Sequence, residues 1–183
     1  MSSGWKMAIY IAVSLLASVG LSVTADYVTI EDPESLYAVV VPAIAAWTFG
    51  IGVAVLTFWL HFQACRMTYR ELIVREPSEP KYVLFAILCL AGMHIGQMTL
   101  WGVAMYTADE LMRLGEITGD TEGAFVDYLN FSMATYTSLG LGDITPTGWL
   151  KVITGIETLT GLLCIGWSAS MFVGKMGTFL EKA

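Results

Sequence analysis

The sequence predicts an all-α membrane protein of four transmembrane helices, with a short re-entrant helix and loop between the third and the fourth. Two observations support this prediction. Of the 183 residues, 56% are hydrophobic and only 14% are charged, which lies outside the range of soluble domains. The chain also contains four apolar segments of about 20 residues or more, the length that a helix needs to cross the hydrocarbon core of a bilayer.

The first two apolar segments, residues 5–24 and 37–61, form with the loop that follows them an N-terminal region, residues 1–80. The first segment has an alternative interpretation. Lys6, the apolar stretch and the VTA sequence that ends at Ala25 also resemble a cleavable signal peptide. We expect a retained helix, with the intervening loop after the second segment in the cytoplasm.

The C-terminal region, residues 81–183, holds the third apolar segment at residues 81–107 and the fourth at 149–173. Between them the sequence predicts a short helix over residues 122–136, capped by Asp120 or Thr121, whose apolar stripe recurs at Phe125, Leu129 and Met133. About 15 residues rise only about 22 Å, too little to cross and return. Because irregular backbone within a membrane must be buried in protein or line water, this segment indicates a pore or a cavity.

Lysine and arginine are distributed unevenly over the loops. Only Arg113 and Lys151 lie on the side of the re-entrant loop, and the other seven lie on the opposite side. The positive-inside rule therefore predicts a multi-pass protein of the cell (inner) membrane with both termini in the cytoplasm. The outer acids are either ordinary solvated charges or an anionic vestibule that concentrates cations: Asp26, Glu31, Asp32, Glu34, Asp109, Glu110, Glu116, Asp120, Glu122, Asp127 and Asp143.

Charge and motif content argue against several classes of function. The net charge of -7 makes nucleic acid a poor partner, because phosphate binding needs a basic surface. The chain has no Ser/His/Asp arrangement, HExxH helix or phosphate-binding loop, so we do not expect an enzyme or an organic cofactor. A single interrupted segment argues against a transporter built from repeats. The three cysteines, Cys65, Cys89 and Cys164, lack metal-ligand spacing and are expected to be packing residues.

The sequence TYTSLGLGDI, residues 135–144, places Gly140 and Gly142 on either side of Leu141, with Asp143 directly after them. Glycine adopts positive φ freely, and glycines at alternate positions allow successive carbonyl oxygens to turn to the same side of an extended strand. A dehydrated monovalent cation needs a cage of oxygens in place of its water, which copies of one such strand around an axis can supply. The motif thus indicates a cation pathway lined by backbone.

Residues 137–143, TSLGLGD, resemble the TVGYGD signature of potassium channels, and the similarity extends over residues 84–179. The resemblance implies a homotetramer in the lipid bilayer, in which the short helix is a pore helix and the third and fourth spans are the outer and inner helices. Potassium ions would be held by the carbonyls of a selectivity filter. The implied ion-binding residues are Ser138, Leu139, Gly140, Leu141 and Gly142, and the implied or proposed supporting residues are Thr137, Asp143, Asn130 and Glu157.

The motif departs from the signature at two positions. Ser138 stands where the signature has threonine, and Leu141 replaces an aromatic residue whose hydroxyl usually braces the filter from behind. Because carbonyls and not side chains contact the ion, potassium selectivity is the expectation. The alternatives are a non-selective monovalent cation channel and a non-conducting accessory membrane subunit. We also expect the Asn130 amide to hydrogen-bond Asp143.

Three further residues of the fourth segment have two interpretations each. An ionisable group within a membrane usually has a function, so Glu157 either hydrogen-bonds to the pore helix or the back of the filter, or faces the cavity as a charge. Gly161 and Gly166 are candidate gating hinges. Their alternative role is to allow close packing between helices.

The chain has two histidines, His61 at the end of the second segment and His94 in the third. His94 and Gln97 share one helix face because they are three residues apart. Either histidine is a candidate pH sensor, and interhelical hydrogen bonding is the alternative. Without nearby carboxylates the two histidines do not make a metal site.

Overall fold

The computed structural model describes residues 33–74 and 80–180 of the chain. The predicted first span, residues 5–24, and its signal-peptide alternative lie outside the described residues. The chain divides into two compact units, residues 1–49 and residues 50–183. The contacts reported below belong to the second unit.

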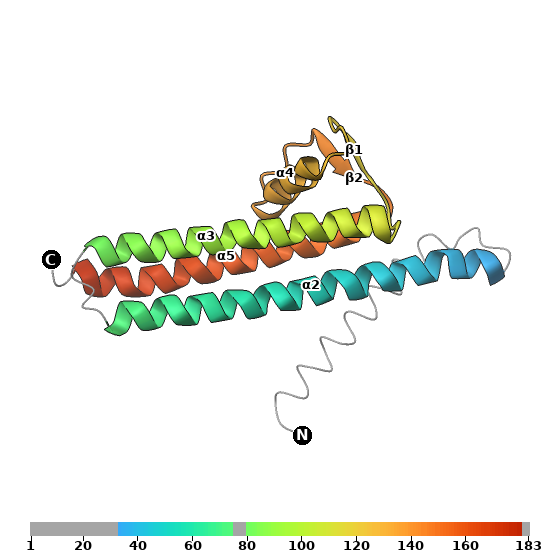
Figure 1. The fold of residues 1–183 in the computed structure, drawn as a ribbon. Coiled ribbons are helices and arrows are strands. Elements are labelled where there is room, and N and C mark those ends of the chain that lie inside the picture. The colour runs from blue at the N-terminus through green and yellow to red at the C-terminus, as the bar shows by residue number, and fades with distance from the viewer. Residues whose placement is uncertain (1–32, 75–79, 181–183) are drawn as a thin grey trace, which may run out of the picture. The chain divides into compact units, whose positions relative to one another are not determined.

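Three long helices dominate the described chain (Figure 1): α2 over Pro33–Val74, α3 over Pro80–Tyr106 and α5 over Leu150–Leu180. Each is long and apolar enough to cross a membrane, over Tyr37–Arg70, Lys81–Leu111 and Leu150–Val173. These helices confirm the second, third and fourth predicted spans. The second helix continues past its predicted end at His61 to Val74. The prediction counted only apolar residues, and the polar residues that follow are also helical.

A short helix, α4 over Phe125–Tyr136, follows a π-helical turn at Thr107–Leu111 that extends α3. Helices α3 and α5 run side by side, and α4 packs against both of them (Figure 1). The approach is close at two glycines. A Cβ atom at Gly102 of α3 would meet a side-chain atom of α4 at 2.8 Å, and a Cβ atom at Gly161 of α5 would overlap the carbonyl oxygen of Tyr136. Glycine is therefore required where α4 meets each long helix.

Two strands of three residues, β1 over Ile117–Gly119 and β2 over Ile144–Pro146, pair in antiparallel fashion, with Ile117 opposite Pro146. The sequence did not predict this sheet, because such short strands show no alternating pattern. Next to the sheet, the amide of Asp120 donates a hydrogen bond to the carbonyl oxygen of Asp143 at 2.9 Å. The sheet thus joins the loop after α3 to the end of the glycine motif.

Asp109 was expected among the solvated outer acids, and this expectation is wrong because the residue is buried. Its carboxylate accepts hydrogen bonds from the Tyr128 hydroxyl of α4 at 2.8 Å and from the Ile117 amide of β1 at 3.2 Å. Burial, and then the bond to Asp109, raise the pKa of Tyr128 above its usual range. Asp109 therefore links the end of α3 to both α4 and the sheet.

Helix α4 begins three residues after its predicted start, with Ala124 as its N-cap residue in place of Asp120 or Thr121. Polar groups of the residues just before the helix find their acceptor in its first turn. The Asp127 carboxylate accepts from the Thr121 hydroxyl at 2.9 Å and from the amides of Glu122 and Ala124. These bonds hold the pKa of Asp127 below its ordinary value, and the bond from Thr121 has the largest effect.

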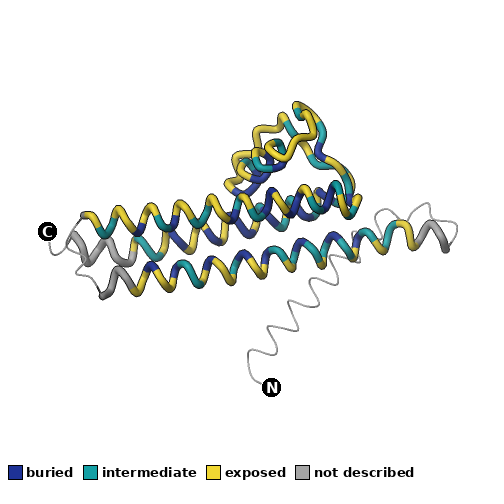
Figure 2. Tube along the Cα trace, in the orientation of Figure 1, coloured by how far each residue is buried: buried dark blue, intermediate teal, exposed yellow. Residues whose placement is uncertain are grey.

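The buried face of α4 differs from the predicted stripe. Phe125 and Met133 of that stripe are 42% and 49% exposed in the single chain, and Figure 2 shows α4 dark blue toward α3 and yellow on its outer side. The buried residues are Tyr128, Phe131, Ser132, Thr135 and Tyr136. The apolar pattern failed because three of these residues bury hydroxyl groups that hydrogen-bond to neighbouring parts of the chain.

We predict that Gly161→Ala destabilises the fold, whereas Gly166→Ala does not. The added methyl at residue 161 would force α4 away from α5, at a cost of about 1–3 kcal/mol. Residue 166 lies on the same helix with no atom within 4 Å of a Cβ, so alanine there is expected to add up to about 1 kcal/mol through helix propensity. Unfolding of both variants in mixed detergent micelles gives the two free energies. Equal stability of the two variants would contradict the packing.

Candidate functional site

The backbone of residues 137–143, hereafter the glycine-rich segment, is left-handed at every second residue. The φ angles are +59° at Ser138, +53° at Gly140 and +81° at Gly142, and the leucines between them have no positive φ. This confirms the conformation predicted for the two glycines. In an ordinary strand successive carbonyls point to opposite sides, whereas this alternation brings them toward the same side. Serine pays about 1–2 kcal/mol for a left-handed φ, so the surrounding structure must hold Ser138 there.

The amide groups at the start of the segment are hydrogen-bonded to α4, while its carbonyl groups are free. The amides of Leu139 and Gly140 both donate to the carbonyl oxygen of Ala134, at 2.8 and 3.2 Å. The carbonyl oxygens of residues 138–142, all of them in exposed residues, accept no hydrogen bond from any described residue. Buried backbone carbonyls are nearly always paired within the protein, whereas exposed ones are open to water or to a ligand. This row of free oxygens is therefore the candidate ligand surface.

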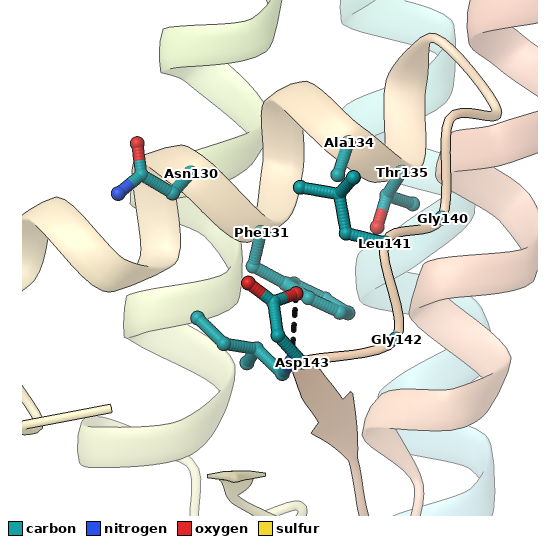
Figure 3. Close-up of a pocket in the computed structure, with 9 residues that line it drawn as sticks. Asn130, Phe131, Ala134, Thr135, Gly140, Leu141, Gly142 and Asp143 are labelled. Carbon is teal, nitrogen blue, oxygen red and sulfur yellow. Dashed lines mark hydrogen bonds between the residues drawn. The ribbon is translucent and has the colours of Figure 1, made fainter. Parts of the chain in front are cut away.

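A small pocket lies between α4 and the glycine-rich segment (Figure 3). Leu141 extends from the segment toward Ala134 of α4, at the side of the segment where the signature aromatic was expected to brace it. Asn130 and Asp143 both line the pocket, yet no hydrogen bond joins them in the described chain. The Asp143 carboxylate accepts instead from the amide of Ile144, at 3.0 Å.

Glu157 of α5 is fully buried and contacts Ser132 of α4, with 2.5 Å between Glu157 Oε1 and Ser132 Oγ. Ser132 Oγ also lies 2.8 Å from the carbonyl oxygen of Met98 on α3. A hydroxyl has one hydrogen and a backbone carbonyl can only accept. Both contacts are hydrogen bonds when Ser132 donates to Met98 and a protonated Glu157 donates to Ser132. Two environments were considered for Glu157, a hydrogen bond and a charge that faces the cavity. The structure has the hydrogen bond to the short helix.

The two histidines and Gln97 come together from different helices. The ring centroids of His61 on α2 and His94 on α3 are 5.5 Å apart, and Gln97 lies 3.4 Å from His61. Two residues that the sequence had not singled out complete the cluster, Tyr136 of α4 and Ser168 of α5. No clear signal in the sequence marked them, because Tyr136 lies among other hydroxyl residues and Ser168 lies two residues from Ser170.

The other candidate residues are also placed by the structure. The Thr137 hydroxyl donates to the carbonyl oxygen of Met133 at 2.7 Å, so it satisfies the last turn of α4. Gly161 lies against α4, whereas Gly166 has open space around it. The cysteines are free thiols: Cys65 and Cys164 are buried and Cys89 is half-buried. Within the described residues, no three histidine, cysteine or acidic side chains gather as metal ligands would.

Comparison with protein families adds to this geometry. The model of the ion channel family matches residues 84–178, more than half of the chain. The chain belongs to the ion channel family. No curated protein and no solved structure matches it. The matched part of this ion channel includes α4, the glycine-rich segment and almost all of α3 and α5, and it agrees with the range 84–179 of the resemblance to within one residue. Helix α2 precedes the match.

We predict that this ion channel tolerates Glu157→Gln better than Glu157→Asp. Glutamine keeps the length of the side chain and donates an N–H to Ser132 in place of the carboxyl hydrogen, so its free energy of unfolding should stay within about 0.5 kcal/mol of the original. Aspartate keeps the acid but cannot reach Ser132, and an unpaired buried group costs about 1–3 kcal/mol. Unfolding in detergent micelles measures both. A glutamine variant as unstable as the aspartate variant would show that the charged carboxylate is required.

Proposed function

We propose that this ion channel conducts potassium through a homotetrameric filter lined by the backbone carbonyls of the glycine-rich segment. The observation that carries the proposal is the row of free, exposed carbonyl oxygens over residues 138–142. A potassium ion that leaves water needs several oxygens around it, and carbonyl rings provide them in sequence. The proposed ligands are the carbonyls of Ser138, Leu139, Gly140 and Leu141, with Gly142 closing the outer end.

Four copies are proposed because one chain supplies oxygens on only one side of an ion. The surface that partner copies would cover is apolar in the single chain. Leu139 and Leu141 are 64% and 67% exposed, and the outer face of α4 presents Phe125 and Met133. In this arrangement α4 is the pore helix, α3 the outer helix and α5 the inner helix. Large exposed apolar surface next to a polar pathway is typical of an interface.

Electrostatics supports a cation as the permeant ion. The C-terminal end of α4 leads into the glycine-rich segment, and a helix C-terminus carries a partial negative charge that stabilises a cation nearby. Exposed acids lie in the loop before α4 and at the end of the segment: Glu116, Asp120, Glu122 and Asp143. At the extracellular mouth of the proposed pore they would raise the local cation concentration.

Leu141 favours a second candidate function, non-selective conduction of monovalent cations. The pocket beside it is lined by Phe131 and Ala134, and Leu141, 67% exposed in the single chain, can gain only apolar contacts there, without the hydroxyl bond that an aromatic residue could make. Apolar contact is less directional than a hydrogen bond. A filter supported in this way would let the carbonyl rings relax around a smaller ion and so reduce discrimination between potassium and sodium.

The test is the reversal potential of purified protein in planar bilayers, with potassium on one side and sodium on the other. We expect reversal near the potassium equilibrium potential. Gly140→Ala should abolish the current, because alanine is strained at the φ of +53° that this residue adopts. Gly92→Ala, at an open position of α3 with no atom within 4 Å of a Cβ, is the matched control and should conduct.

The other outcomes separate the alternatives. Robust current that reverses near zero would overturn potassium selectivity in favour of the non-selective channel. Silence of the unmodified protein, with a particle mass other than a tetramer, would favour the accessory subunit. Current that survives Gly140→Ala would show that ions cross by another route.

A further inference from the structure

Both histidines of the chain lie in one closed cluster of five side chains, here called the histidine ring: His61 of α2, His94 and Gln97 of α3, Tyr136 of α4 and Ser168 of α5. Four of the five are buried and His94 is half-buried. The ring therefore connects all four described helices of more than one turn. His61 lies outside the part of the chain that the ion channel family matches.

One backbone carbonyl sets the direction of the first bonds. Gln97 Nε2 lies 3.3 Å from the carbonyl oxygen of Thr57, which can only accept, so the amide nitrogen must face α2. Gln97 Oε1 then faces Tyr136 and accepts its hydroxyl hydrogen at 2.5 Å. The second hydrogen of Gln97 Nε2 points to His61 Nδ1 at 3.4 Å, so this ring nitrogen must be the acceptor.

The remaining bonds follow from that assignment. A neutral His61 with a bare Nδ1 carries its hydrogen on Nε2, which lies 3.5 Å from Ser168 Oγ and 3.4 Å from Cys65 Sγ. Ser168 can then donate to His94 Nε2 at 3.1 Å. His94 carries its hydrogen on Nδ1 and donates to the Tyr136 hydroxyl oxygen at 3.0 Å. With both imidazoles neutral, each of the five groups donates once and accepts once around the ring.

An added proton leaves one donor of the ring without its acceptor. On His61 it would place an N–H on Nδ1, opposite the N–H of Gln97, and that amide cannot turn over because Thr57 and Tyr136 fix it. On His94 it would make Nε2 a donor, so Ser168 Oγ would accept from both imidazoles and its own hydrogen would lose its acceptor. In the first case two donors face each other in a buried site, and in the second a buried hydroxyl hydrogen loses its partner.

The surroundings of the ring offer no counter-charge. The titratable groups that face it are thiols and a phenol, Cys65 from α2, Cys164 from α5 and Tyr136 itself, and the Trp167 ring lies 5.5 Å from that of His61. No carboxylate contacts either imidazole within the described residues. Glu157, two turns before Cys164 on α5, acts electrostatically on Tyr136, but its carboxyl group is bonded to Ser132. A buried imidazolium without a partner is costly.

We propose that the histidine ring positions the filter and is closed only while both imidazoles are neutral, so that acid reduces potassium conduction. Tyr136 is the last residue of α4 and the glycine-rich segment starts at the next residue. Its hydroxyl bonds to Gln97 and His94, and an added proton disrupts the other link that one of these two residues makes in the ring, so the point from which the carbonyl row begins is held less firmly. The inference rests on the proposed function, because it assigns a role in conduction to a ring next to the proposed filter.

The first experiment compares potassium flux into liposomes at about pH 7.5 and about pH 4.5. The lower value lies well below the ordinary imidazole pKa of about 6.5, because a buried imidazole without a counter-charge is hard to protonate. We expect the flux of the unmodified channel to fall at least about threefold in acid. The double variant H61Q/H94Q, whose amides can donate and accept but do not titrate, should have the same flux at the two pH values. A double variant with the acid sensitivity of the unmodified channel would overturn the proposal.

A second pair of variants tests the link to α4. Tyr136→Phe removes the hydroxyl and keeps the aromatic ring, so at about pH 7.5 its flux should already be as low as that of the unmodified channel in acid, with little further change. Tyr106→Phe removes a hydroxyl of α3 outside the ring and is the matched control. Normal flux and normal acid sensitivity of Tyr136→Phe would overturn the positioning role.

Melting temperature in detergent, measured on the same proteins at both pH values, separates failure of this inference from failure of the proposed function. We expect acid to lower the melting temperature of the unmodified protein by several degrees and to leave that of H61Q/H94Q unchanged. If acid lowers the melting temperature of the unmodified protein alone but no protein conducts at either pH, the proposed function is wrong and the histidine ring is still a pH-dependent contact. If the unmodified channel conducts and neither its flux nor its melting temperature responds differently from the double variant, the channel stands and the ring inference is wrong.

Discussion

The close contact of α4 with α3 and α5 is the constraint on which the candidate site depends. Helix α4 has only 12 residues, and its buried hydroxyl groups find their partners on α3, on α5 and in the π-helical turn after α3. Glycines at residues 102 and 161 let the backbones approach, and only at that distance can Ser132 reach both Met98 and Glu157. The amides at the start of the glycine-rich segment then bond to α4 and leave the carbonyls free.

Much of the fold, but less of the site, could be predicted from the sequence. Long apolar segments identified three of the described helices because hydrophobic length is a strong and local signal. The glycine spacing identified a left-handed alternation because so few residues adopt positive φ easily. The buried face of α4 was not predicted, since an apolar pattern does not count Tyr128, Ser132 and Tyr136, which are buried because their hydroxyls are paired. The sheet and the buried Asp109 depend on contacts between segments far apart in the chain.

Helix α2 has a place in this arrangement although it precedes the part that the ion channel family matches. It contributes His61 and the Thr57 carbonyl, and the carbonyl determines the direction of the bonds around the histidine ring. His61, a polar side chain that is unusual in a membrane span, thus contacts both α3 and α5. In hydrocarbon such bonds have no competition from water, although measured gains for single interhelical bonds average below about 1 kcal/mol.

The glycine-rich segment is fixed at both ends. Its first amides bond to Ala134, and its last carbonyl, that of Asp143, accepts from Asp120 next to the sheet. Between these fixed points the left-handed residues are all even-numbered: 138, 140 and 142. The segment therefore has a parity. Inserting or deleting one residue would move the left-handed conformation onto the leucines and turn every carbonyl that follows to the opposite side, whereas a change of two residues would preserve the pattern and alter only the number of oxygens in the row.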